Sequence, residues 1–429
     1  MNSPVSTSYY RATATPYAAY EPLRGRVHAR VAIVGGGFAG LNTALALAER
    51  GVRDVVLLER EQIGFGASGR NGGFVFAGYS LGEQALLDQL GEQRAAALFG
   101  LTRAAVERIR QRITDYAISC DAVDEGVICA NWFRDPAVLR ERQQRLAERY
   151  GVHWHWLPEE ELRHCIRSQR YHDGLLERDA LHLHPLNYAI GLAAAAAGQG
   201  VRIHEESGAR SLVREGLQWR LRTAQGELLA DQVVLACGGY LAGLQKSVDR
   251  AILPIATYVM VTEPLGDRLH DCLGTRAAIY DSRFAFDYYR ALPDTRLLWG
   301  GRISVFNRAP AAVKRLLTKD LLRVFPQLAG VQVDYAWSGL MSYARHQMPQ
   351  IGGDGNGLWW AQGFGGHGLA PTCAAGELMA AALAEGDDGW RQFADYGLDN
   401  TWRPFGYLAA QASYWWQQSR DCLKSRLEG

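Results

Sequence analysis

The chain has 429 residues, in which 46 Lys and Arg balance 45 Asp and Glu to a formal net charge of +1. This balance excludes the basic excess that nucleic-acid-binding proteins carry. With 48% hydrophobic and 21% charged residues, the composition is globular and excludes a disordered, collagen-like or coiled-coil chain. At roughly 150 residues per domain, the length predicts about two to three domains.

Seven scattered cysteines without a C-x-x-C pair predict reduced thiols in a cytoplasmic protein, with no disulfide framework and no metal site. Residues 1–26 are expected to form an extended N-terminal arm. This segment lacks the apolar core of a signal peptide. No apolar stretch of the sequence is long enough to span a bilayer.

The clearest predicted unit follows the arm. Val31–Val34 is a short apolar run, typical of a strand that is buried on both faces of a parallel sheet. A glycine-rich turn leads into an Ala- and Leu-rich helix over 41–50, and Val55–Leu58 predicts the next buried strand. This order is that of a β-α-β unit.

The rest of the chain alternates between helical and strand patterns. Leu, Ala, Glu and Arg at helical spacing predict helices over 81–150, and 186–199 predicts another. Val233–Ala236 and Leu358–Ala361 predict further buried strands, whereas 252–340 alternates aromatic or β-branched residues with polar ones, as antiparallel sheets do. Buried strands at both ends of the chain therefore predict one domain assembled from separate segments, with a sheet domain inserted.

The turn after the first strand carries the first chemical motif. Gly35, Gly37 and Gly40 form G-x-G-x-x-G, and Glu59 ends the next strand 19 residues later. These glycines permit a tight turn, the approach of a pyrophosphate and close helix packing, and the helix N-terminus offers free N–H groups to phosphate. Glu59 can accept hydrogen bonds from a ribose. This context predicts a dinucleotide site; the alternative is a glycine-rich turn without a ligand.

A second glycine-rich loop over 63–73 follows the acid. It can run beneath a long ligand, with Ser68 and Arg70 able to reach its phosphates. The loop favours FAD over NAD, the alternative being a flexible surface loop.

Motifs along nearly the whole chain resemble those of one family. They are Ser8-Tyr9-Tyr10, the Gly35 fingerprint, GASGRNGG at 66–73, His182–Asn187, Asp287–Arg290 and GFGGHG at 363–368. With them the sequence resembles the D-amino-acid oxidase/glycine oxidase superfamily of FAD-dependent oxidoreductases, and most of all its γ-glutamylputrescine oxidase group. GASGRNGG and G-x-x-G-H-G are together specific.

The resemblance implies an α/β fold with a Rossmann-like, glutathione-reductase-like FAD-binding domain and an α+β substrate domain on a mixed or antiparallel sheet. The FAD-binding domain is expected over 27–115, 180–245 and 340–390, the substrate domain over 116–179 and 246–339, and a C-terminal helical extension over 391–429. The residues expected at the cofactor are Gly35, Gly37, Phe38, Ala39, Gly40, Glu59, Arg60, Gly66, Ala67, Ser68, Arg70, Asn71, Gly72, Gly73, Ala209, Cys237, Gly238, Gly363, Phe364, Gly366, His367, Gly368 and Leu369.

The resemblance also implies that backbone near Ala209 contacts the adenine and that Gly363–Leu369 lies beside the flavin ring. A glycine-rich turn that opens a helix directs N–H groups and the positive end of the helix dipole at one point, where negative charge on a reduced flavin would be stabilised. His367 either assists there or only packs. His182 and His184 are expected to form a structural turn before a helix.

One position departs from the family pattern. Amino-acid oxidases of the superfamily hold the substrate carboxylate with an Arg shortly after a Trp-x-Gly stretch, and Met341 stands at that position here. Because Met cannot form a bidentate ion pair, a simple α-amino acid is not the expected substrate. Other candidate anion partners, each with a structural ion pair as the alternative, are Arg302, Arg283, Arg290 and Arg345. Sarcosine-oxidase relatives attach FAD through a Cys near this segment, and none occurs over 337–349, so noncovalent FAD is expected.

An aromatic pocket is expected, with two or three lining residues drawn from Phe284, Phe286, Tyr288, Trp299 and Tyr343. Such a dry pocket disfavours the ammonium form of an amine and leaves the neutral form, whose lone pair the oxidation needs. The candidate catalytic residues are His367, Tyr288, Phe286, Met341 and Arg302.

The activity implied is FAD-dependent oxidation of an amine to an imine, which hydrolyses to an aldehyde and an amine or ammonia, with electrons passing to O2. An extended or γ-glutamylated polyamine is the implied substrate. One alternative is a dehydrogenase of N-substituted amino acids, of sarcosine or opine type, that reduces a quinone or an electron-transfer protein; another is a flavin-binding protein without turnover. We expect a cytoplasmic monomer or small homo-oligomer with a small-molecule substrate, no nucleic acid and no membrane span.

Overall fold

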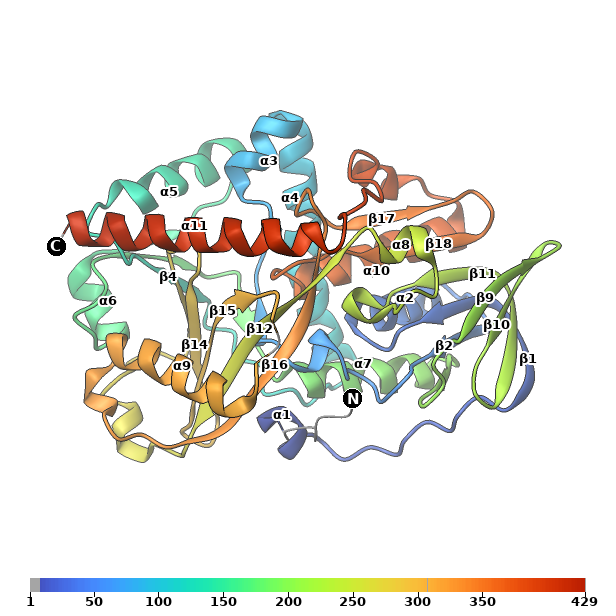
Figure 1. Ribbon diagram of the computed structural model, residues 1–429, viewed down its shortest axis with the longest axis horizontal. Coiled ribbons are helices and arrows are strands. Elements are labelled where there is room, and N and C mark those ends of the chain that lie inside the picture. Colours follow the sequence, from blue (N-terminus) through green and yellow to red (C-terminus); the bar gives the residue numbers. More distant parts are fainter. Residues whose placement is uncertain (1–7, 307, 429) are drawn as a thin grey trace.

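The computed structural model describes residues 8–306 and 308–428 and contains two eight-stranded sheets that lie side by side (Figure 1). The first seven residues of the predicted arm lie outside this range. The first sheet has the order β17-β18-β11-β1-β2-β8, with β10 paired to β11 and β9 to β10. Its strands are β1 (Gly25–Val34), β2 (Val55–Leu58), β8 (Arg202–His204), β9 (Ser211–Glu215), β10 (Gln218–Arg222), β11 (Gly226–Leu235), β17 (Gln350–Gly353) and β18 (Leu358–Gln362).

The centre of the first sheet is parallel. β1 pairs in parallel with both β2 and β11, and β11 pairs in parallel with β18. Val31–Val34 and Val55–Leu58 are buried throughout, because helices cover one face of these strands and β10 with the segment after β11 covers the other. The four predicted buried strands and their assembly from separated segments are therefore confirmed.

The second sheet is mixed, with the order β16-β12-β15-β14-β13-β4-β6-β5. Only β13 and β4 pair in parallel; the other neighbours are antiparallel. Its strands are β4 (Val127–Ala130), β5 (His155–Leu157), β6 (Gly174–Glu177), β12 (Leu253–Thr262), β13 (Ala278–Asp281), β14 (Asp287–Ala291), β15 (Leu297–Ser304) and β16 (Val333–Tyr343). The predicted fold class is confirmed, whereas the exact domain boundaries stay predictions.

Helices cover both sheets (Figure 1). α2, α7 and α10 pack with the first sheet, and α9 packs on β12, β15 and β16 of the second. The prediction of helices throughout 81–150 was wrong in part, because the short run Val127–Ala130 forms β4, which lies between β13 and β6 in the second sheet. The α-helices of the described residues are α1 (Tyr9–Ala12), α2 (Phe38–Glu49), α3 (Glu83–Leu90), α4 (Glu92–Asp115), α5 (Ala137–Tyr150), α6 (Glu159–Cys165), α7 (Pro185–Gly198), α8 (Lys246–Asp249), α9 (Pro310–Val324), α10 (Leu369–Glu385) and α11 (Phe405–Leu427).

Parallel pairing brings functional segments to one edge of the first sheet. β1, β2, β11 and β18 all run in the same direction, so their carboxyl ends lie together. Gly35, Glu59, Ala236 and Gly363 each follow directly after one of these strands. In open α/β sheets, ligands bind outside this edge.

Arg290 on β14 connects the second sheet to the first domain. Its side chain is buried, and its guanidinium donates hydrogen bonds to the carbonyl of Gly72 (2.8 Å), the carbonyl of Leu183 (2.9 Å) and the hydroxyl of Tyr10 (3.3 Å). The short pair β3 (Phe74–Val75) and β7 (Leu181–His182) lies at the same junction. Arg290 is therefore a structural residue and not a substrate-binding one.

The predicted turn at His182 and His184 lies at the same junction. His184 Nδ1 accepts a hydrogen bond from the backbone N–H of Asn187 and so caps α7. Burial, reinforced by the charge of Arg290, lowers the pKa of His182 to about 3 and that of His184 to about 4. Both rings are consequently neutral near pH 7.

None of the helices in 8–306 and 308–428 combines the length and the apolar character that crossing a bilayer requires. All seven cysteines are free thiols, and Cys422 on α11 is the one whose side chain is exposed. No group of three or more His, Cys, Asp and Glu within the described residues could hold a metal ion.

Arg290→Met should lower the free energy of unfolding by about 2–6 kcal/mol, because two buried carbonyls lose their donor at roughly 1–3 kcal/mol each. Urea denaturation followed by circular dichroism measures this change. Arg163→Met is the matched control, since Arg163 makes only a surface i,i+4 ion pair, which contributes at most about 1 kcal/mol. Equal effects of the two substitutions would contradict the role of Arg290.

Candidate active site

A cleft of about 1690 Å³ is lined by both sheets, the start of α10 and one face of α11. Most sites for a small ligand enclose roughly 300–1,000 Å³. The cleft therefore has room for a dinucleotide-sized group together with a substrate.

Nearly all predicted site residues lie on the wall of this cleft. All five candidate catalytic residues line the cleft, as do all predicted cofactor residues except Gly40, Gly73 and Gly363. A Cβ at Gly40 would lie 2.0 Å from the carbonyl oxygen of Gly35, and one at Gly73 would lie 2.0 Å from that of Leu183. These glycines permit close backbone packing behind the wall, and Gly363, at φ +75°, permits the turn before α10.

Gly35 and Glu59 shape the end of the cleft at α2. Gly35 has φ +116°, and a Cβ there would lie 2.6 Å from the carbonyl oxygen of Ala236, so only glycine fits. Glu59 accepts hydrogen bonds from the backbone N–H groups of Gly36 (2.7 Å) and Glu61 (2.9 Å). Burial raises the pKa of Glu59, and the two hydrogen bonds oppose this effect because they stabilise the carboxylate. Because a carboxylate has about four acceptor sites, Glu59 retains capacity for a ribose diol.

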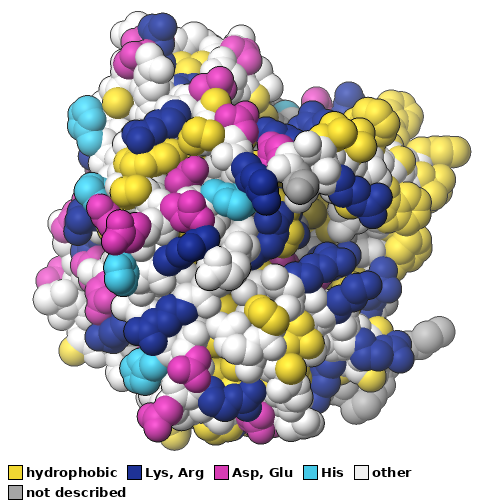
Figure 2. Space-filling model, turned by 90° about the vertical axis from the view of Figure 1, so that its left-hand side faces the viewer, with side chains coloured by type: hydrophobic (Ala, Val, Ile, Leu, Met, Phe, Trp, Pro, Cys, Tyr) yellow, Lys and Arg dark blue, Asp and Glu magenta, His cyan; other side chains and the backbone are white. Residues whose placement is uncertain are grey.

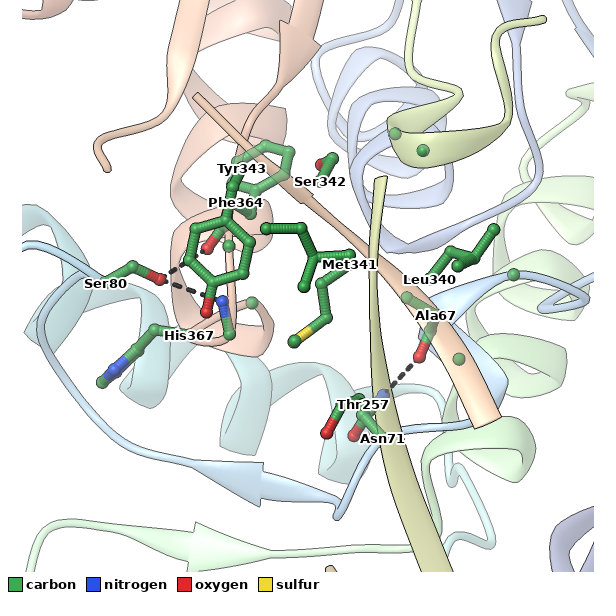
Figure 3. Close-up of a pocket in the computed structure, with 18 of the residues that line it drawn as sticks. Ala67, Asn71, Ser80, Thr257, Leu340, Met341, Ser342, Tyr343, Phe364 and His367 are labelled. Carbon is green, nitrogen blue, oxygen red and sulfur yellow. Dashed lines mark hydrogen bonds between the residues drawn. The ribbon is translucent and has the colours of Figure 1, made fainter. Parts of the chain in front are cut away.

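The predicted phosphate-binding loop follows. Ser68 Oγ accepts from the N–H of Phe38 at the start of α2 (2.9 Å), which fixes the loop against that helix. Arg70 donates to the carbonyl oxygens of Phe65 (2.8 Å) and Ser338 (3.3 Å), so its guanidinium joins the loop to β16. The side-chain amide of Asn71 donates to the carbonyls of Ala67 and Ser68 and so holds the loop together internally. Figure 3 shows the bond to Ala67.

The turn before α10 forms another part of the wall (Figure 3). Ser80 Oγ donates to the carbonyl of Phe364 (3.2 Å) and accepts from the N–H of Gly366 (3.0 Å), which fixes the turn. The N-cap residue Gly368 has no side chain that could cap the first turn of α10. The positive end of the helix dipole is therefore directed at the cleft wall.

His367 packs at this turn. Its Nε2–H donates to the carbonyl of Phe76 (3.1 Å), and the two rings meet edge to face at 4.1 Å. Burial lowers the pKa of His367 to about 4, so the ring is neutral near pH 7. In Figure 3 the ring points away from Met341 and Asn71. These contacts favour packing over a cationic role.

Aromatic rings cover the wall formed by the second sheet. Phe284, Phe286, Tyr288 and Tyr343 line the cleft, more than the two or three expected. Trp299 does not: it is fully buried and stacks on Tyr289 at 4.5 Å, so its prediction as a lining residue was wrong. Burial of Trp299 reflects its place on the face of β15 that α9 covers.

Two glycines make space for the ring of Tyr288. A Cβ at Gly300 would lie 2.0 Å from its ring, and one at Gly72 would lie 2.6 Å from it. Tyr288 is therefore held between the cofactor loop and β15. Burial raises the pKa of Tyr288, as well as that of Tyr343 to about 12, so both hydroxyls are neutral.

The candidate anion partners differ in their availability. Arg302 forms a bidentate ion pair with buried Asp320, at 2.6 and 2.8 Å. Arg283 pairs with Asp281 and Asp287. Arg345 also lines the cleft, is exposed, and has no described carboxylate within ion-pair distance. Met341, on β16, also lines the cleft.

Several lining residues were missed by the sequence analysis. They are Phe74, Phe76, Ser80, Tyr280 and the ion pair of Glu83 with Arg142, whose Nη2–Oε1 distance is 2.6 Å. No spacing rule connects them, because they come from three separate segments, 74–83, 142 and 280. The alternation around Phe74 and Phe76, directly after GASGRNGG, was the one available signal.

The described residues fit the FAD that the sequence resemblance implies. Gly37, at the N-cap of α2, and Gly368, at that of α10, both lack a side chain and both line the cleft. Backbone N–H groups suited to phosphate thus lie at one helix start, and N–H groups suited to a charged ring lie at the other. Glu59 lies beside the first of these and can accept from a ribose.

Comparison with known proteins supports this arrangement. The sequence model of a family described as FAD dependent oxidoreductase matches residues 30–382. The Gamma-glutamylputrescine oxidoreductase of Escherichia coli (strain K12) is 36% identical over 393 residues, which cover 91% of this chain and 92% of that protein. The Probable oxidoreductase OrdL of Haemophilus influenzae is 34% identical and covers 89% of this chain and 88% of its own length.

Solved structures share the fold. The L-amino acid deaminase from Proteus myxofaciens superposes with a TM-score of 0.73 at 17% identity, covering 92% of this chain and 97% of that chain. The glycine oxidase from Geobacillus kaustophilus gives a TM-score of 0.70 at 23% identity, covering 87% and 98%.

Glu59→Ala should weaken cofactor binding by roughly 1.5–3 kcal/mol, the contribution of a charge-assisted hydrogen bond, or about ten- to a hundredfold in Kd. The recovery of flavin fluorescence on dilution of the holoprotein measures this. Glu61→Ala, at a half-exposed neighbouring position, is the control and should leave Kd unchanged. Equal affinities of the Glu59 variant and the unmodified protein would contradict the role of Glu59.

Acid precipitation should release all of the flavin. Among the described residues, Cys237 is the one cysteine on the cleft wall, and burial raises the pKa of its thiol to about 12, so the nucleophilic thiolate is scarce. A white pellet and a yellow supernatant in trichloroacetic acid are expected. Fluorescence that stays with the chain on a denaturing gel would contradict noncovalent binding.

Proposed function

The chain belongs to this family of FAD-dependent oxidoreductases, and from that premise we propose that it oxidises the C–N bond of an extended amine, with a γ-glutamylated polyamine as the substrate class and O2 as the electron acceptor. The observation that carries the proposal is a wide, aromatic-walled cleft with Met341 where amino-acid oxidases of the superfamily hold a carboxylate. The name of the 36% identical relative supports the same substrate class.

The aromatic wall selects the reactive form of the substrate. Phe286, Tyr288 and Tyr343 surround the substrate end with rings and with neutral hydroxyls. Desolvation there disfavours the ammonium ion, so the neutral amine is bound for oxidation. Bound FAD supplies the two-electron oxidising group, and the product imine hydrolyses to an aldehyde and an amine or ammonia.

The turn before α10 supplies the electrostatic environment. Its backbone N–H groups and the helix dipole favour negative charge at this end of the cleft. Ser80 holds the turn in place through two hydrogen bonds, and neutral His367 holds it against Phe76. The role of these residues is to position the backbone groups.

A γ-glutamyl group carries a carboxylate far from the reacting nitrogen. Arg302 is already paired with Asp320 and is expected to shape the wall. Arg345 is exposed on the cleft wall and is the cation that we assign to this carboxylate.

The proposal is tested by an anaerobic screen of amines, read as loss of flavin absorbance. γ-Glutamylputrescine should bleach the flavin faster than putrescine, and admission of air should then produce hydrogen peroxide. The rate should rise with pH, because only the neutral amine reacts. Absence of bleaching by any amine would reject the proposal, and bleaching without peroxide would reject O2 as the acceptor.

Arg345→Ala should raise KM for γ-glutamylputrescine by roughly ten- to a hundredfold, as expected for the loss of a charge-assisted contact, while KM for putrescine changes little. Steady-state kinetics on both amines measures the difference. Arg308→Ala, an exposed arginine outside the cleft wall, is the control. Parallel changes for both amines would remove Arg345 from substrate selection.

Met341→Arg should move the preference toward small amino acids. A guanidinium there could pair with the α-carboxylate of such a substrate. A gain of roughly 2–3 kcal/mol in transition-state binding would raise kcat/KM about thirty- to two-hundredfold. Glycine, sarcosine and D-alanine are the probes, and Met341→Leu is the isosteric control. Efficient turnover of sarcosine or D-alanine by the unmodified protein would contradict the importance of Met341.

A further inference from the structure

Helix α11 turns its polar face toward the protein. Gln411 and Tyr414 are buried, and Gln411 Oε1 accepts hydrogen bonds from the Ser304 hydroxyl (3.2 Å) and the Val305 N–H (3.1 Å). Farther along, Asp421 accepts from the N–H of Phe284 (2.8 Å). The usual orientation of a surface helix, with apolar residues inward, is reversed here.

The outer face of α11 is apolar. Leu408, Phe405, Trp415, Trp416, Leu423 and Leu427 are between 57% and 79% exposed. At 100° per residue they fall within an arc of roughly 120° along the whole helix. Trp402 and Phe306, 65% and 57% exposed, lie beside this helix, and we call these eight residues the α11 face.

The α11 face concentrates the exposed apolar surface of the molecule. The other large hydrophobic side chains that are exposed in the described residues are Phe284 and Phe286 at the cleft, and Val213 and Leu217 on the β9–β10 hairpin. Figure 2 shows apolar side chains gathered along one edge of the molecule, on the side where α11 lies. A patch with three Trp and two Phe exceeds the few hundred Å² that soluble monomers ordinarily expose.

The exposed, unpaired charges on α11 itself are basic. Arg420 and Arg426 are exposed, and no described carboxylate lies within ion-pair distance of either. The acidic residues of this segment point elsewhere: Asp421 binds Phe284, and Glu428 accepts from the N–H of Arg134 (2.8 Å). The outer surface of the helix is thus apolar with a basic rim.

We propose that the α11 face docks on an anionic lipid bilayer, with the helix lying in the plane of the headgroups. Trp, Phe and Leu on one face with Arg at its margins is the pattern of interfacial helices, and Trp favours the headgroup level. Docking of a second copy through the same face is disfavoured, because that copy would bring further arginines and no outward carboxylate to pair with them.

Docking would bring the cleft close to the bilayer. Phe405, Ala409, Ser413 and Tyr414 of the same helix line the cleft, so one helix forms both its wall and the docking face. This inference is independent of the substrate assigned above, since it rests on surface residues alone.

The test is flotation of the full-length holoprotein with vesicles of phosphatidylcholine alone or mixed with phosphatidylglycerol. Binding to the mixed vesicles is expected, weaker on neutral vesicles and falling as salt is raised. Trp415→Ser combined with Trp416→Ser should reduce binding by roughly tenfold or more. Arg420→Glu with Arg426→Glu should reduce binding to anionic vesicles by at least about fivefold per charge. Leu217→Ser, which removes an exposed apolar side chain on the hairpin, is the matched control and should bind as the unmodified protein does.

The flavin absorbance and melting temperature of each variant verify that it is folded. If the unmodified protein does not float with anionic vesicles, the proposal is wrong. Sedimentation that shows a dimer, dissociated by the Trp substitutions, would then identify a second copy as the occupant. Equal binding to neutral and anionic vesicles would overturn the anionic preference.

Discussion

A single buried cation connects the two halves of this molecule. Arg290 belongs to the sheet that carries the aromatic wall, yet its hydrogen bonds end on the cofactor loop, on the segment before α7 and on the N-terminal helix. These oxygens are neutral, as is a fourth partner, His182 Nδ1 at 3.4 Å, so the guanidinium is stabilised by hydrogen bonds instead of an opposite charge. Burial of the two rings, reinforced by the charge of Arg290, lowers the pKa of His182 and His184 and keeps both uncharged, which avoids charge repulsion in the same volume. Together with Arg70, which joins the cofactor loop to β16, Arg290 fixes the relative position of the cofactor loop and the substrate wall.

The cleft itself is built by pairing large groups with glycines. Tyr288 occupies the space that Gly72 and Gly300 leave open, and the turn before α10 is held by the hydroxyl of Ser80 from another part of the chain. Most arginines on the wall are neutralised by aspartate or glutamate, as in Arg142 with Glu83 and Arg283 with Asp281. Substrate selection is therefore expected to depend on the shape of the cleft, on the exclusion of water and on Arg345.

The sequence was most informative where local rules apply. Buried strands, the G-x-G-x-x-G turn and the loop at 66–73 follow from periodicity and glycine spacing, and the structure confirms the first sheet that they predict. β4 was missed because a four-residue apolar run between helices resembles helix core, and only pairing with β13 and β6 makes it a strand. Trp299 was misplaced because the alternation pattern does not show which face of a strand meets the cleft. The partners of Arg302 and Arg70 are distant in sequence and could not be read from it.

The exposed thiol on α11 has a practical consequence. Cys422 is exposed, whereas the other six cysteines are buried or half-buried, and burial raises the pKa of Cys120, Cys237, Cys272 and Cys373 to about 12. A maleimide dye or nitroxide should therefore label the natural protein at one place, without cysteine substitutions. That place is the helix whose outer surface is apolar, so the emission colour or mobility of the label would report directly on what surrounds the helix.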